Sequence, residues 1–378
     1  MKHIAINALG LKSNTGGVES YVYNNVKALL DNDLQNKYYL FIGKNVENIF
    51  NDLLVYKNLK IIIHPIDTNN SNIRVFWEST ILSLELLKYK IDLAHHIGNY
   101  LPWICPVKSV VTIHDLVPFF YNEYYPEYKI TQRFYNYFKT AVKYTVKKAD
   151  KIIVISEFTK NELIKFFDID KSKIEVIYQS LDSRKQKDTP DQSALGQYKI
   201  DKPYLLSVSV IRPHKNIVFL IKVFNLLKEK YNIPHQLVIA GGIHFGGEKF
   251  SEEINNSLYK EDIKYLGFVD NKDLASLYTY ADIFLFPSLY EGFGIPLLEA
   301  MKVNLPIICS DISIFKEVCG KNGMYFNPSD EEDTCNKIFN LLSDNALKQN
   351  LIENSKNQLK KFCWDKIAES LIKVYEKF

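Results

Sequence analysis

The sequence predicts an α/β protein built from two doubly wound parallel sheets, and three observations support this fold. Short runs of β-branched residues alternate with longer helical segments along the chain, which is the pattern of repeated βαβ units. Runs such as IIIHPI and VVTIHD are apolar almost throughout, as expected for strands that helices cover on both faces. A chain of 378 residues also exceeds what one core usually organises, so we expect two domains.

The first half of the chain alternates regularly between strands and helices. Helical segments are expected between the strands, for example at 19–30 and 132–148. The expected strands are 4–7, 38–42, 59–64, 92–95, 109–113, 151–155 and 173–177. This alternation predicts a first doubly wound domain.

The composition changes at 183–197, where the polar run SRKQKDTPDQSALGQ is predicted to be an exposed linker or a surface loop. The alternation then restarts, and the expected strands are 204–208, 236–240, 263–266, 283–286, 306–308 and 324–326. We therefore predict an N-terminal domain over 1–185 and a C-terminal domain over 186–363. Because ligands of open α/β sheets bind beyond the carboxyl ends of the strands, we expect a cleft between the two domains to hold the ligands.

Composition and charge narrow the function classes. The formal net charge of +3 is too close to neutral to indicate a nucleic-acid partner. The five cysteines form no CxxC pair, which fits free thiols in a reducing compartment better than a disulfide framework or a structural zinc site. The N-terminus becomes polar after a short apolar run, unlike a signal peptide, and no run reaches the roughly 18 apolar residues of a membrane span. We therefore expect a cytoplasmic protein whose membrane contacts are at most peripheral.

The strongest local motif is FPSLYEGFGIPLLEAM at 286–301, which begins where an expected strand ends. Its glycines permit unusual backbone angles and a close approach of a ligand to main-chain N–H groups. The helix that Pro296 can begin presents free N–H groups and the positive end of its dipole, which suit a phosphate. Glu299 can accept two ribose hydroxyls, and Glu291 can hold a sugar hydroxyl. The candidate donor-binding residues of this motif are Glu291, Gly292, Phe293, Gly294, Ile295, Leu297 and Glu299.

The succession of a strand, Glu291, the run GFGIPLL and Glu299 resembles the E-x7-E signature of the retaining glycosyltransferases of family 4, also called group 1. The resemblance covers essentially the whole chain. It implies the GT-B fold, in which two Rossmann-like domains face each other across a cleft, and a nucleotide-diphosphate sugar as donor. It also implies that a last helix, at 364–378, crosses back to the N-terminal domain.

A basic loop, SVSVIRPHKN, follows the first expected strand of the second domain at 207–216. It resembles the family loop in which an arginine and a lysine hold the donor diphosphate, and Lys215 falls on the family lysine. The arginine departs from the family spacing, so either Arg212 or His214 completes this clamp, or one charge is missing. Fixed cations here would stabilise the negative charge that a leaving diphosphate gains in the transition state.

Two segments of the first half are similar to the family's acceptor side. SNTGGVESYV places Gly16 and Gly17 after the first strand, where the family has a GG loop near the diphosphate and acceptor; a plain turn is the alternative. VVTIHDLVPFF ends a buried strand with His114, which the resemblance places near the transferred sugar; a structural histidine is the alternative. Asp115 either orients His114 or caps the next turn. The catalytic candidates are His114, Lys215 and Glu291.

The segment 128–151 is rich in Tyr, Phe and Lys. Helical spacing separates Phe134, Phe138, Val142 and Thr145, so this face is predicted to belong to the core. The basic, aromatic remainder is either a solvated face or a surface for an anionic membrane or a lipid-diphosphate acceptor. Further candidates for stacking on sugar rings are Tyr21, Trp77 and Trp103.

The resemblance implies transfer with retention at the anomeric carbon, through front-face substitution. No DxD-type motif stands out, so we expect metal independence and no cofactor besides the donor substrate. GDP-mannose is the first candidate donor, because of a general likeness to bacterial polysaccharide mannosyltransferases, and a UDP-hexose is the second. The expected acceptor is a growing cell-surface glycan, carried on a lipid at the inner face of the plasma membrane, on a protein or on a soluble molecule. A sugar-nucleotide epimerase of the same fold and a noncatalytic sugar-nucleotide-binding protein are the alternatives.

Overall fold

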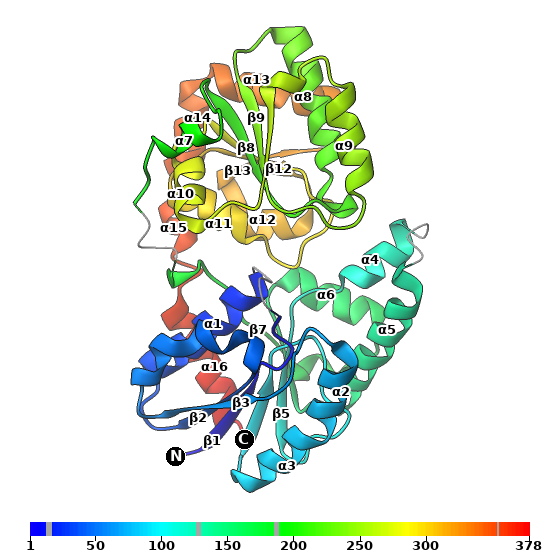
Figure 1. The fold of residues 1–378 in the computed structure, drawn as a ribbon, viewed down its shortest axis with the longest axis vertical. Helices are drawn as coiled ribbons and strands as arrows, with labels where there is room; N and C mark the ends of the chain where they lie inside the picture. Colours follow the sequence, from blue (N-terminus) through cyan, green and yellow to red (C-terminus); the bar gives the residue numbers. More distant parts are fainter. Residues whose placement is uncertain (13–16, 126–129, 185–188, 354) are drawn as a thin grey trace. The chain divides into compact units, whose positions relative to one another are not determined.

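The computed structural model describes residues 1–12, 17–125, 130–184, 189–353 and 355–378. These residues form two compact units, each a sheet with helices packed on it (Figure 1). The first unit comprises Met1–Asp182 together with Phe362–Phe378, and the second comprises Ser183–Lys361. No helix of the described ranges combines the length and the apolar character that crossing a membrane requires.

The first unit is built on a seven-stranded sheet in which neighbouring strands run parallel. The strand order across the sheet is β3-β2-β1-β4-β5-β6-β7. The strands are β1 (His3–Asn7), β2 (Lys37–Gly43), β3 (Leu59–His64), β4 (Leu93–His96), β5 (Lys108–Ile113), β6 (Lys151–Val154) and β7 (Ile174–Val176). Central strands such as β5 and β6 are buried along nearly their whole length, because helices cover both faces of the sheet.

The helices of the first unit fill the crossovers between the strands. They are α1 (Gly17–Asn32), η1 (Lys44–Val55), α2 (Ser71–Ser79), α3 (Ile81–Lys88), α4 (Val117–Tyr124), α5 (Ile130–Lys148), α6 (Glu157–Phe166), η2 (Lys171–Lys173) and α16 (Trp364–Glu376). The last of these, α16, packs against α1 (Figure 1). Its Tyr375 hydroxyl lies 2.6 Å from Nδ1 of His95, which is fully buried in β4.

The second unit repeats the plan with a six-stranded parallel sheet in the order β10-β9-β8-β11-β12-β13. The strands are β8 (Tyr204–Val208), β9 (Gln236–Ala240), β10 (Ile263–Gly267), β11 (Ile283–Phe286), β12 (Ile307–Ser310) and β13 (Gly323–Phe326). The helices are α7 (Ala194–Gln197), η4 (Pro213–Lys215), α8 (Ile217–Tyr231), α9 (Gly247–Asn256), η5 (Lys260–Asp262), α10 (Asn271–Thr279), α11 (Ile295–Lys302), α12 (Ser313–Cys319), η6 (Gly320–Asn322), α13 (Glu331–Ser343), α14 (Asn345–Glu353) and α15 (Ser355–Leu359). The predicted α/β fold with two doubly wound sheets is therefore confirmed.

In each sheet the chain order reverses at one point, between β1 and β4 in the first unit and between β8 and β11 in the second. At such a point the connections that follow the two strands diverge, which leaves a crevice at the carboxyl edge where α/β proteins bind ligands. The basic loop of the second unit follows β8, and the carboxylate motif follows β11. Both motifs thus lie at the point where the fold favours a ligand.

Three expectations about individual residues were wrong. The polar run at 183–197 is not irregular to its end, because it closes with α7, whose Leu195 is buried. In α5, Phe138, Val142 and Thr145 are buried as expected, but Phe134 is 54% exposed. Tyr21 cannot stack on a sugar ring, because it is 1% exposed and its ring packs edge-on against His114.

Candidate active site

The loop after β8 is held in a defined shape by main-chain bonds. The N–H of Ser209 donates to the carbonyl of Ala240 at 2.9 Å, and the N–H of Ile211 donates to the carbonyl of Gly242 at 2.9 Å. Pro213 then begins the single turn η4, which ends at Asn216 in the left-handed region with φ 57°. The amide of Asn216 donates to the carbonyl of Pro328 at 3.0 Å. This anchoring fixes the position from which Lys215 projects.

Lys215 forms an ion pair with Glu291, which brings two of the predicted catalytic residues together. Both side chains are only 13% exposed, so water screens the pair weakly. Ser288 donates to the same carboxylate oxygen at 2.9 Å. The N–H of Leu289 also donates to the carbonyl of His214 at 2.7 Å, so the loops after β8 and β11 are joined through both main chain and side chains.

Arg212 and His214 differ in the charge they can offer to an anion. His214 is 3% exposed, and its burial, together with the nearby Lys215 and Arg212, lowers its pKa well below the ordinary value. His214 is therefore neutral near pH 7. The guanidinium of Arg212 lies 5.8 Å from the ring centre of Phe245, and its buried Nε has no hydrogen-bond partner within the described part of the chain. Of the two alternatives, only Arg212 supplies a positive charge.

The glycine before α11 has a conformational requirement. Gly294 has φ 112°, a value that side-chain-bearing residues rarely adopt, and a Cβ at this position would lie 3.1 Å from Cδ1 of Leu297. Phe293 and Leu297 are buried, so their side chains hold the motif onto the core. Ile295 starts the helix. The unusual backbone angle that the sequence predicted before this helix is therefore present, and it occurs at Gly294, the second glycine of the motif.

Glu299 is oriented by a residue from a different helix. The hydroxyl of Tyr278, on α10, donates to Oε2 of Glu299 at 2.9 Å. Tyr278 is 3% exposed, and burial followed by the charge of Glu299 raises the pKa of its hydroxyl well above the ordinary value. Tyr278 therefore remains a hydrogen-bond donor at every physiological pH and fixes one oxygen of this carboxylate.

In the first unit, His114 follows β5 and is almost completely buried. Its N–H donates to Oδ1 of Asn99 at 2.7 Å, and its ring packs against Tyr21 with centroids 4.7 Å apart. Burial lowers the pKa of His114 to about 4, and its Nε2 has no hydrogen-bond partner among the residues described. His114 is thus a neutral ring with one unused nitrogen. Asp115 caps the next turn, since its Oδ1 accepts from the N–H of Val117 at 3.1 Å.

Only part of the predicted GG loop belongs to the residues that the structure describes. Gly16 lies outside the described residues, and Gly17 is the first residue of α1. Glu19 stands in the first turn of that helix, where its charge suits the helix dipole. The structure therefore leaves the function of this loop as a prediction.

Several residues at this edge of the second sheet were not predicted. Ser288 and Tyr278 hold the two acids, but neither stands at a recognisable spacing from its partner. Gly241, after β9, has φ 138°, and a Cβ there would lie 1.9 Å from the carbonyl oxygen of Ser209. The pair Gly241-Gly242 directly after an expected strand was a readable signal for this close approach.

Two Rossmann-like units, one of which carries paired cations and acids beside a helix N-terminus at its switch point, define a glycosyltransferase with the GT-B fold. Among solved structures, HepE from Anabaena in complex with UDP and glucose has the same fold, with a TM-score of 0.74 and 16% identity over 100% of both chains. The chain is also 27% identical over 294 residues to O-antigen chain mannosyltransferase B of Escherichia coli, covering 77% of this chain and 76% of that protein. It is 32% identical over 233 residues to O-antigen chain mannosyltransferase RfbU of Salmonella typhimurium, covering 62% of this chain and 60% of that protein.

Family models match both halves of the chain. Residues 15–185 match the model for glycosyltransferase family 4, and residues 191–358 match the model for glycosyl transferases group 1. The chain therefore belongs to the family 4, or group 1, glycosyltransferases, as the motifs in the sequence indicated.

Proposed function

We propose that this glycosyltransferase transfers a hexose, with mannose as the first candidate, from a nucleotide-diphosphate sugar to a growing glycan of a cell-surface polysaccharide. The observation that carries the proposal is the ion pair of Lys215 and Glu291 at the switch point of the second sheet, with Arg212 in the same loop as Lys215. A partly buried cation already held by an acid is suited to an anion that arrives and leaves with each turnover.

The positive charges at the carboxyl edge of the second sheet suit the binding of a diphosphate. Lys215 and Arg212 are the fixed cations of the loop after β8, and the N-terminus of α11 adds its dipole. When the bond to the sugar breaks, negative charge grows on the diphosphate, and preorganised cations stabilise that charge most strongly where water is excluded. In the ligand-free protein, Glu291 keeps the charge of Lys215 compensated.

The two acids are suited to hydroxyl groups of the donor. Glu291 accepts from Ser288 and Lys215 through one oxygen, Oε1, and we assign its carboxylate to a sugar hydroxyl. Glu299 has one oxygen fixed by Tyr278, and we assign its carboxylate to the ribose hydroxyls. Hydrogen bonds from hydroxyls to an ionised carboxylate are among the stronger ones in proteins, about 1.5–3 kcal/mol each.

The sugar and the base are inferred from the relatives. Two relatives bear the name of O-antigen mannosyltransferases, which favours mannose and hence GDP-mannose as donor. HepE is a fold neighbour bound to UDP and glucose, which keeps a UDP-hexose as the second candidate. His114 would then position the transferred sugar through its unused Nε2, acting as a neutral hydrogen-bonding group rather than as a general acid.

We further propose that transfer retains the anomeric configuration and needs no metal ion. The cations of the loop after β8 and the N-terminus of α11 offer the positive charge that a divalent ion supplies in other transferases. The leaving phosphate then accepts the proton of the acceptor hydroxyl. The configuration of the product, read by NMR, and an unchanged rate in EDTA check these two points.

We also propose a peripheral contact with an anionic membrane, through the exposed lysines of α5. Lys139, Lys143 and Lys147 are exposed on this helix, and Phe134 is exposed near its start. Basic side chains beside an exposed aromatic ring favour the surface of an anionic bilayer. Co-sedimentation with vesicles that contain anionic lipid, compared with neutral vesicles, tests this contact; equal binding to both would contradict it.

The first experiment is a thermal-shift screen of the purified protein against GDP-, UDP- and dTDP-sugars. A ligand that binds the folded state raises the melting temperature, and at equal concentration the shift grows as Kd falls, so the donor that binds most tightly gives the largest shift. We expect GDP-mannose to stabilise the protein most. If none of these compounds stabilises the protein at millimolar concentration, the proposed donor class is wrong.

A further inference from the structure

The loop that follows β4 is joined to the end of β5 through Asn99. The ladder between these strands ends where His96 pairs with Val111, so the main-chain groups of β5 beyond this point need another partner. The N–H of Asn99 donates to the carbonyl of Thr112 at 3.0 Å. The side-chain oxygen Oδ1 of Asn99 then accepts from the N–H of His114 at 2.7 Å. Asn99 thus extends the ladder past the end of β4 and up to His114.

The backbone of Asn99 explains why a side chain supplies the second of these bonds. Asn99 has φ 64°, in the left-handed region, where the chain bends out of the strand direction. A residue of a parallel strand makes such a pair of bonds with its own N–H and C=O, whereas here the side-chain oxygen takes the place of the carbonyl. Asparagine and aspartate combine tolerance of a left-handed backbone with a side-chain oxygen at this reach. This position therefore requires two properties that few residue types share.

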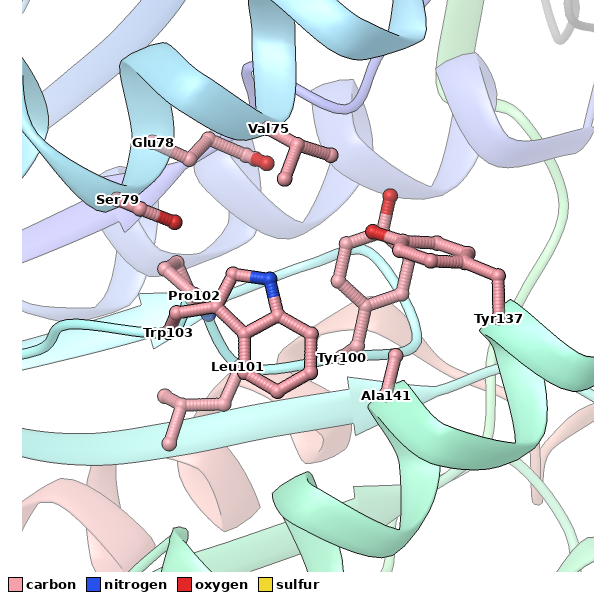
Figure 2. Close-up of a pocket in the computed structure, with 9 residues that line it drawn as sticks. All are labelled: Val75, Glu78, Ser79, Tyr100, Leu101, Pro102, Trp103, Tyr137 and Ala141. Carbon is pink, nitrogen blue, oxygen red and sulfur yellow. The ribbon is translucent and has the colours of Figure 1, made fainter.

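The rest of the loop is fixed between two helices, α2 and α5. The N–H of Leu101 donates to Oγ1 of Thr145 at 2.7 Å, and the hydroxyl of Tyr144 donates to the carbonyl of Trp103 at 2.7 Å; Thr145 and Tyr144 belong to α5. Figure 2 shows the loop between side chains of α2 and α5, and the hollow among them has room for about one water molecule. Asn99 therefore stands at the start of a loop that is held in place.

His114 is contacted from three directions, and Asn99 provides one of them. The hydroxyl of Thr159, on α6, lies 3.5 Å from the carbonyl oxygen of His114. The ring of Tyr21, on α1, packs edge-on against the imidazole. Nε2 of this imidazole is buried without a hydrogen-bond partner in the described part of the chain, so it is the atom left for a ligand. Its direction depends on the main chain that carries the ring.

We propose that Asn99 is a positioning residue for glycosyl transfer: by holding the N–H of His114, it keeps the imidazole directed at the transferred sugar. This inference rests on the proposed function of His114, and it gives Asn99 no contact of its own with the sugar. A displacement of about 1 Å in a group that acts on the reacting atoms can lower turnover about 100-fold. Since the donor diphosphate is assigned to the second unit, the loss of Asn99 should lower kcat and leave the Kd for the donor unchanged.

The test compares two substitutions of Asn99 in the full chain, with the donor that thermal shift identifies. Asn99→Gly keeps the left-handed backbone but removes Oδ1, whereas Asn99→Asp keeps both. We expect kcat to be about 10- to 100-fold lower in Asn99→Gly and within about threefold of the unchanged protein in Asn99→Asp. Asn232→Gly is the matched control, because Asn232 is an exposed asparagine with φ 47° at the end of α8, and this variant should keep full activity.

Hydrogen exchange at the amide of His114 provides a second measurement, which does not depend on activity. We expect this N–H to exchange about tenfold faster in Asn99→Gly than in Asn99→Asp, since only the aspartate keeps the acceptor. Mass spectrometry with fragmentation to single residues measures the two rates. Equal rates would show that Asn99 does not hold His114, and they would overturn the inference.

His114→Ala separates this inference from the proposed function. If His114→Ala loses activity while Asn99→Gly keeps it, or if kcat falls as far in Asn99→Asp as in Asn99→Gly, the inference alone is overturned. If His114→Ala keeps the full rate, the proposed function of His114 is wrong and the inference fails with it. If no nucleotide sugar binds the unchanged protein, the proposed donor class is wrong, and the inference again fails with the function on which it rests.

Discussion

The carboxyl edges of the two sheets share one plan but carry different chemistry. In the second unit, two cations and two acids converge on the switch point, and each acid is held by a hydroxyl donor. In the first unit, the corresponding edge holds His114, whose pKa burial lowers to about 4, and Arg74 of α2 is paired with Glu78 of the same helix. These three residues of the first unit carry no net charge near pH 7, whereas the loop after β8 in the second unit carries two cations.

This difference locates the specificity of the enzyme in its loops. Both sheets are parallel and reverse their chain order at one point, while the residues that follow the strands at that point differ in charge. One scaffold therefore carries paired charges beyond one set of strands and a buried neutral histidine beyond the other. Four experiments test this contrast, from the largest expected effect to the smallest.

Removing Lys215 should cause the largest loss. Lys215→Ala takes away a partly buried cation and leaves Glu291 without its ion-pair partner, so we expect kcat to fall about 100- to 1,000-fold. The measurement is steady-state transfer from the donor identified by thermal shift. Lys222→Ala, which removes an exposed lysine of α8, is the control and should keep full activity. A loss below threefold for Lys215→Ala would contradict the electrostatic contrast between the two edges.

The second prediction concerns acid pH. Four histidines of the first unit are buried, and burial lowers their pKa to about 3 or about 4; they are His64, His95, His96 and His114. Because the unfolded chain binds these protons at about pH 6.5, stability is complete above that pH and is lost as the pH falls. Between pH 7.5 and 6 we expect a loss of about 3 kcal/mol in the first unit, slightly less than 1 kcal/mol for each histidine.

The tryptophans allow this loss to be measured in the first unit alone. The chain has three, Trp77, Trp103 and Trp364, and all of them belong to the first unit. Urea titrations followed by tryptophan fluorescence at pH 7.5 and pH 6 therefore report the first unit, while circular dichroism reports both. The same free energy of unfolding at the two pH values would show that these histidines do not stay neutral in the fold.

Removing Glu299 should weaken donor binding with a smaller effect on turnover. We expect Glu299→Ala to raise the Kd for the donor about 10- to 100-fold, because one or two charge-assisted hydrogen bonds are lost. Tyr278→Phe should raise it only a few-fold, because the carboxylate remains but is no longer fixed. Calorimetric titration measures both constants, and Glu252→Ala on the exposed face of α9 is the control. An unchanged Kd in Glu299→Ala would remove this residue from the donor site.

The smallest effect is expected for Gly294→Ala. The new Cβ would meet Cδ1 of Leu297 at 3.1 Å on a backbone with φ 112°, which costs about 1–2 kcal/mol. We expect a melting temperature a few degrees lower and a several-fold weaker donor affinity. Gly196→Ala has open space around its Cβ and should not destabilise the protein. Equal melting curves for the two variants would show that the turn before α11 is not constrained.

The fold could be predicted well from the sequence because the two patterns that indicate it, the alternation of apolar runs and the motif from Glu291 to Glu299, are both local. Alternating apolar runs located every expected strand, with ends that differ by at most two residues. The motif from Glu291 to Glu299 was recognisable because its residues lie within nine positions of one another on either side of a helix start. Where the pattern was weaker, at α7 and at the exposed start of α5, individual predictions failed, since a short polar segment or a helix end has little periodicity to read.

The residues that complete the sites were not predictable in this way. Tyr278 reaches Glu299 from another helix, and Arg74 reaches Tyr100 across a strand and a helix. Such pairs are set by how crossovers pack on the sheet, which no periodicity records. The choice between Arg212 and His214 also needed the structure, because it depends on how deeply the imidazole is buried.

The position of α16 has a consequence for how the protein is made. The first unit is discontinuous in sequence, since its last helix follows all of Ser183–Lys361. During synthesis, the whole second unit is translated before Tyr375 exists to meet His95, or to accept from Nζ of Lys2 at 2.8 Å. Until α16 is made, the surface of the first unit that it covers, including part of α1, stays exposed. The half of the chain that is translated first is therefore the last to finish folding.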